Sequence, residues 1–124
     1  MLIRLYDGRR RDLYMQLADE IIRLMAEGEL KVGDELPSIR KLASSLQVNT
    51  KTVQTAYQKL ADEGFILLRK KATAIVSREN FHEENWLERW GENFTLFHNE
   101  CKARNLSDDE ITKYLKQLLK SHDG

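Results

Sequence analysis

The chain has 124 residues, of which 41% are hydrophobic and 32% are charged, with six glycines and one proline. This composition predicts a folded, mainly helical chain made of one compact domain and a small appendage. The length excludes a separate large catalytic or ligand-binding domain within these residues, and a single cysteine excludes an internal disulfide framework and a cysteine-rich zinc site.

The charges are divided unevenly along the chain, although the formal net charge is zero. Residues 1–78 carry 14 Lys and Arg against 10 Asp and Glu, a balance of +4, whereas residues 79–124 carry 6 against 10, a balance of −4. Such a division is expected when only one part of a protein meets a polyanion. We therefore expect two domains with these bounds.

No stretch approaches the roughly 18 apolar residues that a membrane-spanning helix needs, and the apolar run at the N-terminus is too short for a secretory signal. The sequence therefore predicts no membrane partner and a cytoplasmic location. A reducing compartment also suits the lone cysteine, Cys101.

The first predicted elements are a short strand over residues 2–6 and a long helix over residues 11–28. In the helix, apolar residues recur at steps of three and four, which indicates a face buried in a core, and Gly28 ends it. Three consecutive arginines, Arg9 to Arg11, precede the helix. They could contact DNA phosphate or could simply be solvated.

Residues 37–64 have the pattern of a helix-turn-helix. Apolar residues recur at helical spacing on both sides of residues 47–49, which predicts two short helices joined by a tight turn. Ser38 is expected to cap the first helix, and either Asn49 or Thr50 to cap the second. Gly64 is expected to close the second helix.

This motif has no carboxylate between Glu35 and Asp62, in a chain that is rich in charge. The cations in the same stretch are Arg40, Lys41, Lys51 and Lys59. A surface free of acids and rimmed with cations suits phosphate. The alternative interpretation is that two amphipathic helices simply pack together and that the cations face solvent.

Residues 36–66 read LPSIRKLASSLQVNTKTVQTAYQKLADEGFI. This stretch resembles the winged helix-turn-helix of the GntR family of bacterial transcription regulators, and VNTKTVQTAY is most similar to the YtrA-type branch. The resemblance covers about half the chain. It implies a mainly α fold with a small β-hairpin, in which an N-terminal winged helix-turn-helix is followed by a two-helix tail. It also implies a homodimeric repressor that binds double-stranded DNA at a palindromic operator, often one of a membrane-transporter operon.

In a helix-turn-helix, the first turn of the second helix reaches base edges in the major groove. We expect this role for the exposed positions there, which are Asn49, Thr50, Lys51, Thr52, Gln54 and Thr55. Ser38 and Arg40 are placed to hold the DNA backbone, and the resemblance puts Arg40 where the family uses an arginine for DNA contact. Many relatives carry arginine at the positions of Thr50 and Gln54, so we expect a different operator sequence.

Residues 65–69 and 73–77 read as two strands of a hairpin, which would be the wing. The family's wing tip usually carries two glycines, which allow a close approach to DNA, followed by Thr and an aromatic residue. This chain has Lys71, Thr73, Ala74 and Ile75 in those places, with no glycine. We therefore expect Lys70 and Lys71 to contact phosphate in place of an inserted wing tip.

The tail is predicted to hold a helix over residues 79–104 and a second helix that starts at a capping box formed by Ser107 and Glu110. Two amphipathic helices are too small to form a self-sufficient core. We expect a homodimer whose interface holds Trp86, Trp90, Phe94, Phe97, Tyr114, Leu115 and Leu118. The alternative is that both helices pack on the first domain.

Two other functions compete with DNA binding. An enzyme is disfavoured because His82, His98 and His122 lie far apart and no catalytic or metal-ligand spacing emerges, so we expect no cofactor and no metal. A winged helix that binds only an acidic protein partner stays open. An aromatic-lined cleft between the tail and the first domain, or between two tails, could also hold a small apolar effector.

Overall fold

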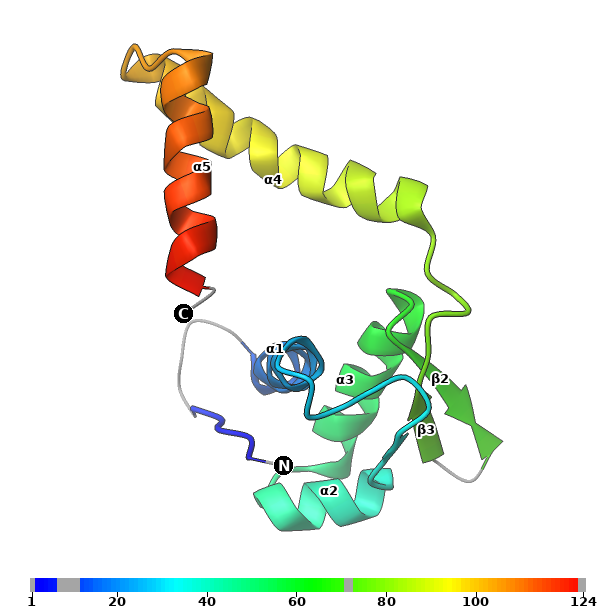
Figure 1. Cartoon of the computed structure of the whole chain (residues 1–124). Coiled ribbons are helices and arrows are strands. Elements are labelled where there is room, and N and C mark those ends of the chain that lie inside the picture. The colour runs from blue at the N-terminus through cyan, green and yellow to red at the C-terminus, as the bar shows by residue number, and fades with distance from the viewer. Residues whose placement is uncertain (1, 7–11, 71–72, 123–124) are drawn as a thin grey trace. The chain divides into compact units, whose positions relative to one another are not determined.

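The structure is a computed structural model that describes residues 2–6, 12–70 and 73–122. The described residues form α1 (Leu13–Ala26), β1 (Glu35–Leu36), α2 (Ile39–Leu46), α3 (Thr50–Asp62), β2 (Ile66–Arg69), β3 (Thr73–Val76), α4 (Glu83–Ala103) and α5 (Asp108–His122) (Figure 1). They divide into two compact units, one ending at His82 and one starting at Glu83. The expected fold class, a winged helix-turn-helix followed by two helices, is confirmed.

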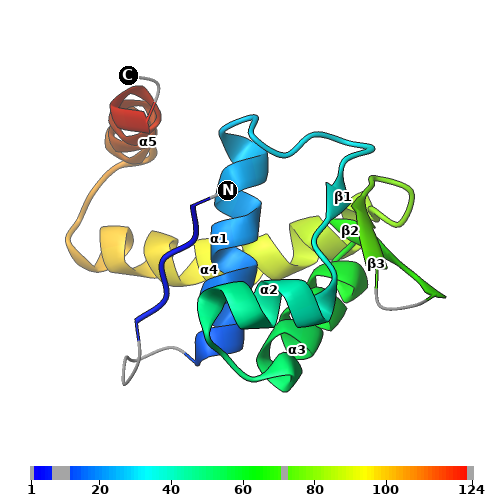
Figure 2. The same cartoon turned by 90° about the horizontal axis from the view of Figure 1, so that it is seen from below.

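The first unit is built around one buried face of α3. Three helices pack together and the sheet flanks them at one edge (Figure 2). The apolar positions that recur at helical spacing in the sequence form this core, as the periodicity predicts. Its fully buried side chains are Leu17, Ala18 and Ile21 of α1, Val53, Ala56, Tyr57 and Leu60 of α3, and Ile66 and Ala74 of the sheet.

The wing is a three-stranded antiparallel sheet in which β3 lies between β1 and β2. The predicted hairpin is confirmed, with Ile66 opposite Val76 and Arg69 opposite Thr73. The sequence pattern did not predict β1, whose two residues pair with β3 through Glu35 opposite Ile75. A strand of two residues is too short to show a period of two, so only the fold reveals it.

The predicted strand over residues 2–6 is wrong, because these residues form no strand. Their backbone groups bond to side chains of α1. Gln16 both accepts from the Tyr6 N–H at 2.7 Å and donates to the Tyr6 carbonyl at 2.9 Å, and Arg23 donates to the Leu2 carbonyl at 2.9 Å. Ile3 and Leu5 pack against the core. The apolar residues of this segment therefore serve to pack it on the first unit, and its backbone bonds to α1 instead of to a strand.

Helices α1 to α4 share one type of C-terminal ending. In each, a residue with positive φ follows the helix, and the next N–H donates to the carbonyl five residues earlier, at 2.9 to 3.1 Å, as in a Schellman motif. Gly28 and Gly64 occupy the left-handed position after α1 and α3, as expected. Gln47, with φ of 56°, occupies it in the turn between α2 and α3, where a side chain is strained.

We predict that Gln47→Gly raises the free energy of unfolding by about 0.5–1 kcal/mol, because relief of the left-handed strain exceeds the entropy that glycine loses on folding. Urea denaturation followed by circular dichroism measures the change. Gln58→Gly is the matched control, since Gln58 lies inside α3 and the same substitution there should lower stability by about 1 kcal/mol. A loss of stability in both variants would contradict the prediction.

The second unit consists of α4 and α5, and its connection contains the predicted capping box. The Glu110 N–H donates to Ser107 Oγ at 3.2 Å, and the Ser107 N–H donates to Glu110 Oε1 at 3.1 Å. Glu110 Oε1 accepts from the Ser107 N–H and also from Ser107 Oγ, at 3.1 Å, and these two bonds hold the pKa of the Glu110 carboxylate below its usual range. Among the described residues of this unit, only Cys101 and Ile111 are buried. Its apolar residues are therefore mostly exposed.

Candidate nucleic-acid interface

The first turns of α2 and α3 are both capped by a side-chain oxygen. Ser38 Oγ accepts from the Lys41 N–H at 3.2 Å, and Asn49 Oδ1 accepts from the Lys51 N–H at 2.9 Å. The structure thus assigns the second cap to Asn49 and leaves Thr50 as the first residue of the helix. The N-terminal end of a helix attracts anions, so both ends suit a nearby phosphate.

Tyr57 holds the two helices of the motif in register. Its side chain is buried in the core, and its hydroxyl donates to the Pro37 carbonyl at 2.7 Å, just before α2 begins. Burial raises the pKa of the Tyr57 hydroxyl well above its usual range, so the group stays a neutral donor. This bond joins the middle of α3 to the start of α2.

The structure brings the predicted base-reading residues together at the N-terminal end of α3. Asn49, Thr50, Lys51 and Gln54 are exposed, whereas Thr52 and Thr55 are half-buried. Val53 and Ala56, between them, point into the core. The exposed side chains therefore form one surface on the solvent side of the helix, as contact with base edges in the major groove requires.

The cations of the motif do not all face the same way. Arg40, Lys41 and Lys51 are exposed, but Lys59 is half-buried and its Nζ lies 2.6 Å from Glu63 Oε1, one turn further along α3. Lys59 is thus paired away from the N-terminal turn. The sequence did not reveal this, because Glu63 lies just past the acid-free stretch.

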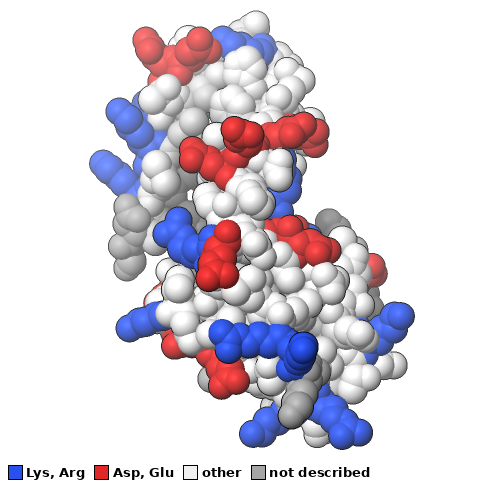
Figure 3. Space-filling view, turned by 90° about the vertical axis from the view of Figure 1, so that its right-hand side faces the viewer, with Lys and Arg blue, Asp and Glu red and all other residues white. Residues whose placement is uncertain are grey.

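The wing presents further cations beside the motif. Lys70 is exposed at the end of β2, and its carbonyl accepts from Thr73 Oγ1 at 3.3 Å. Arg69 is also exposed, a cation that the sequence analysis did not single out. Figure 3 views the side of the first unit on which β2 and β3 lie, and blue Lys and Arg side chains stand out along its lower part. Lys71 and the arginines at 9–11 lie outside the described residues.

No three His, Cys, Asp or Glu side chains among the described residues come together as ligands for a metal ion. None of the helices in the described part of the chain is long and apolar enough to cross a membrane.

Residues 13–76 match the family described as bacterial regulatory proteins of the gntR family. The chain belongs to the GntR family. The matched segment runs from the start of α1 to the end of β3 and so contains the whole helix-turn-helix and the wing. At the level of the family, the chain is a DNA-binding transcription regulator.

Similar proteins support the YtrA type within this family. YtrA from Sulfolobus acidocaldarius, a GntR-family transcription factor, has a structure that is 38% identical, covers 98% of this chain and all of its own, and has a TM-score of 0.60. The transcriptional repressor YtrA of Bacillus subtilis is 41% identical over 64 residues, 51% of this chain and 49% of its own length. The transcriptional regulator YhcF of B. subtilis is 29% identical over 84% of this chain and 87% of its own length. This chain therefore spans about half of one of these Bacillus relatives and most of the other.

We predict that Arg40→Ala weakens binding to every DNA sequence and lowers the salt slope by about one, whereas Gln54→Ala relaxes preference at one base pair by about 1–3 kcal/mol. Arg40 can neutralise a phosphate, and Gln54 can make two hydrogen bonds to adenine. Fluorescence anisotropy on selected and scrambled duplexes measures both effects.

Lys59→Ala is the control for the loss of a cation, because Lys59 already pairs with Glu63 and should matter little for DNA binding. Equal weakening on selected and scrambled DNA by both Arg40→Ala and Gln54→Ala would contradict the assignment.

Proposed function

We propose that this protein is a sequence-specific repressor that binds a roughly palindromic operator as a homodimer. The observation that carries the proposal is the exposed N-terminal turn of α3, which follows the Asn49 cap and lies in a motif whose neighbouring cations, Arg40 and Lys51, are exposed. Residues 1–78 would bind DNA and residues 79–124 would form the dimer. The name of B. subtilis YtrA as a repressor supports the sign of regulation.

The residues of this turn match the chemistry of base edges. Lys51 can donate to guanine, and Gln54 can both donate to and accept from adenine. Thr50 and Thr52 can contact a thymine methyl group or donate to a phosphate. Ser38 and Arg40 would hold the backbone from the start of α2, while Lys70 and Lys71 would do so from the wing.

The proposed dimer rests on the apolar side chains that the second unit leaves in solvent. Trp86 is 41% exposed, Trp90 is 49% exposed and Phe94 is 48% exposed, and these residues follow one another at steps of four along α4. On α5 the exposed apolar residues are Tyr114, Leu115, Leu118 and Leu119. Phe97 is half-buried. Soluble monomers rarely expose so many large apolar groups together. We therefore propose that the same helices of a second copy of the chain cover these side chains in a dimer.

A symmetric dimer explains why the operator should be palindromic. Two copies related by a two-fold axis present two α3 helices, and their half-sites lie about one helical turn of DNA, or a multiple of it, apart. The family resemblance suggests an operator next to genes for a membrane transporter. We therefore propose that the repressed genes encode a membrane transporter.

We predict that the protein binds DNA from immediately upstream of its own coding region more tightly than a shuffled duplex of equal length. If about six to ten phosphates are neutralised, affinity should fall by roughly three to five orders of magnitude between 50 mM and 200 mM salt. Fluorescence anisotropy at two salt concentrations measures preference and salt dependence together. Equal weak binding to both duplexes would favour a winged helix that binds an acidic protein partner.

We predict that Trp90→Asp produces monomers, because a charge placed in the aromatic stripe of α4 would be buried without a partner in the dimer. Analytical ultracentrifugation measures the mass. Asn99→Asp is the matched control, since Asn99 is exposed on the opposite side of α4 and receives the same charge. An unchanged dimer in Trp90→Asp would remove this stripe from the interface.

A further inference from the structure

The last residues of the first unit cross the C-terminal end of α3 at very close range. We call residues 77–82, which lead from β3 toward α4, the strap. At Gly64, a Cβ atom would lie 2.5 Å from the carbonyl oxygen of Asn80, 2.9 Å from its carbonyl carbon and 3.0 Å from the Cα of Phe81. All three atoms belong to the backbone, so they cannot move aside as a flexible side chain can. The strap can sit here only because residue 64 is a glycine.

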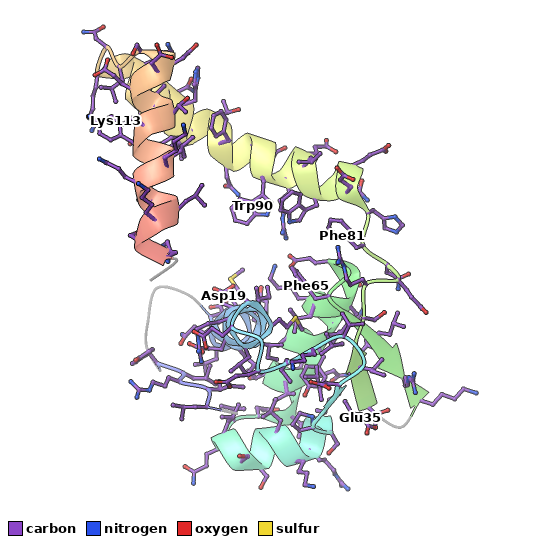
Figure 4. The ribbon with its side chains drawn as sticks, in the orientation of Figure 1. Asp19, Glu35, Phe65, Phe81, Trp90 and Lys113 are labelled. Atoms are coloured by element: carbon purple, nitrogen blue, oxygen red, sulfur yellow. The ribbon has the colours of Figure 1, made fainter. Side chains whose placement is uncertain are left out.

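The strap is held in a defined turn. The Ser77 N–H donates to the Phe65 carbonyl at 3.1 Å, and Ser77 Oγ accepts from the Glu79 N–H at 3.1 Å. The Phe81 N–H donates to the Arg78 carbonyl at 3.1 Å, and the Arg78 guanidinium lies 5.9 Å from the centre of the Phe81 ring. Phe65 and Phe81 mark the two segments that meet at this end of α3 (Figure 4).

Gly28 serves as a comparison for Gly64, because it ends a helix in the same way but no other segment of the described chain crosses it. Both Gly28 and Gly64 end a helix in the same hydrogen-bonded motif, with φ of +83° and +85°. Around Gly28, however, nothing lies within 4 Å of the place where a Cβ would stand. Both glycines thus have the left-handed conformation. Of the two, only Gly64 is closely approached by another segment of the backbone, the strap.

The strap also connects α3 to the tail in space, because it crosses the end of α3 at Gly64 and then leads directly into α4. Only His82 separates Phe81 from the first residue of α4, Glu83. Because α3 is a rigid helix of 13 residues, about 20 Å long, its base-reading turn and the seat of the strap move as one body. The point at which the chain leaves the first unit is therefore tied to the helix that would read DNA.

We infer that Gly64 and the strap are positioning elements that set the distance between the two α3 helices of the dimer, and hence the half-site spacing that the protein prefers. The inference rests on the proposed homodimer. When the tails of two copies are bound to each other, displacing the strap at Gly64 would change the position of each α3 relative to α3 of the other copy. Base contacts within one half-site, which lie at the other end of α3, should not change.

The test uses full-length protein and duplexes that carry the half-site obtained by in vitro selection with the wild type. The half-site is presented alone, or as inverted repeats whose spacing changes by one base pair at a time. Wild type should show one optimal spacing. Gly64→Ala should shift that optimum or reduce its advantage by about tenfold, because a dimer that no longer spans both half-sites loses avidity. Binding to a single half-site should stay within about twofold.

Gly28→Ala is the matched control, because it has the same backbone strain without the contact. It should lower the melting temperature yet keep the wild-type spacing profile. If Gly64→Ala keeps the same profile as Gly28→Ala, the inference is wrong while the proposed function stands. If wild type binds inverted repeats no better than single half-sites, the proposed function itself fails.

A second variant covers the case in which Gly64→Ala does not fold. Insertion of two glycines between Phe81 and His82 leaves Gly64 and its contacts unchanged but makes the connection to α4 longer and more flexible. This insertion should flatten the spacing profile, as measured on the same duplexes. A sharp profile with the wild-type optimum would show that the spacing is set elsewhere and would overturn the inference.

Discussion

Tyr57 donates a hydrogen bond from inside the core to the carbonyl of Pro37, and the geometry of the DNA-binding motif depends on this contact. A buried phenol without an acceptor would cost about 1–3 kcal/mol, so α3 is favoured in the register in which its hydroxyl reaches the chain just before α2. That register holds the start of α2, with the Ser38 cap, against the middle of α3. It also turns the side of α3 that carries Lys51 and Gln54 toward solvent.

Much of the first unit could be predicted from the sequence because its signals are local. The apolar period of α1 and α3, the caps at Ser38 and Asn49, and the left-handed glycines at the helix ends each depend on residues within a few positions of one another. The exposed N-terminal turn of α3 follows from the same period. For the tail, the capping box located the start of α5 in the same way.

The features that could not be predicted arise from contacts between distant segments. The strand β1 exists only because β3 pairs with it, and residues 2–6 look like a strand although their backbone bonds to side chains of α1. The role of Gly64 shows the same limit. Its left-handed φ could be expected from the helix ending, but the backbone of Asn80 that crosses it lies 16 residues away along the chain.

The two caps have a consequence for the thermodynamics of recognition. Ser38 and Asn49 each satisfy one N–H group in the first turn of α2 and α3 with their own side chains, so both helices begin in place without a phosphate. The reading surface is therefore preorganised, and little chain entropy has to be lost when DNA arrives. Association on such a surface differs from the folding of a disordered basic segment on DNA. Its heat-capacity change should reflect the surface buried at the interface, with little contribution from new helix.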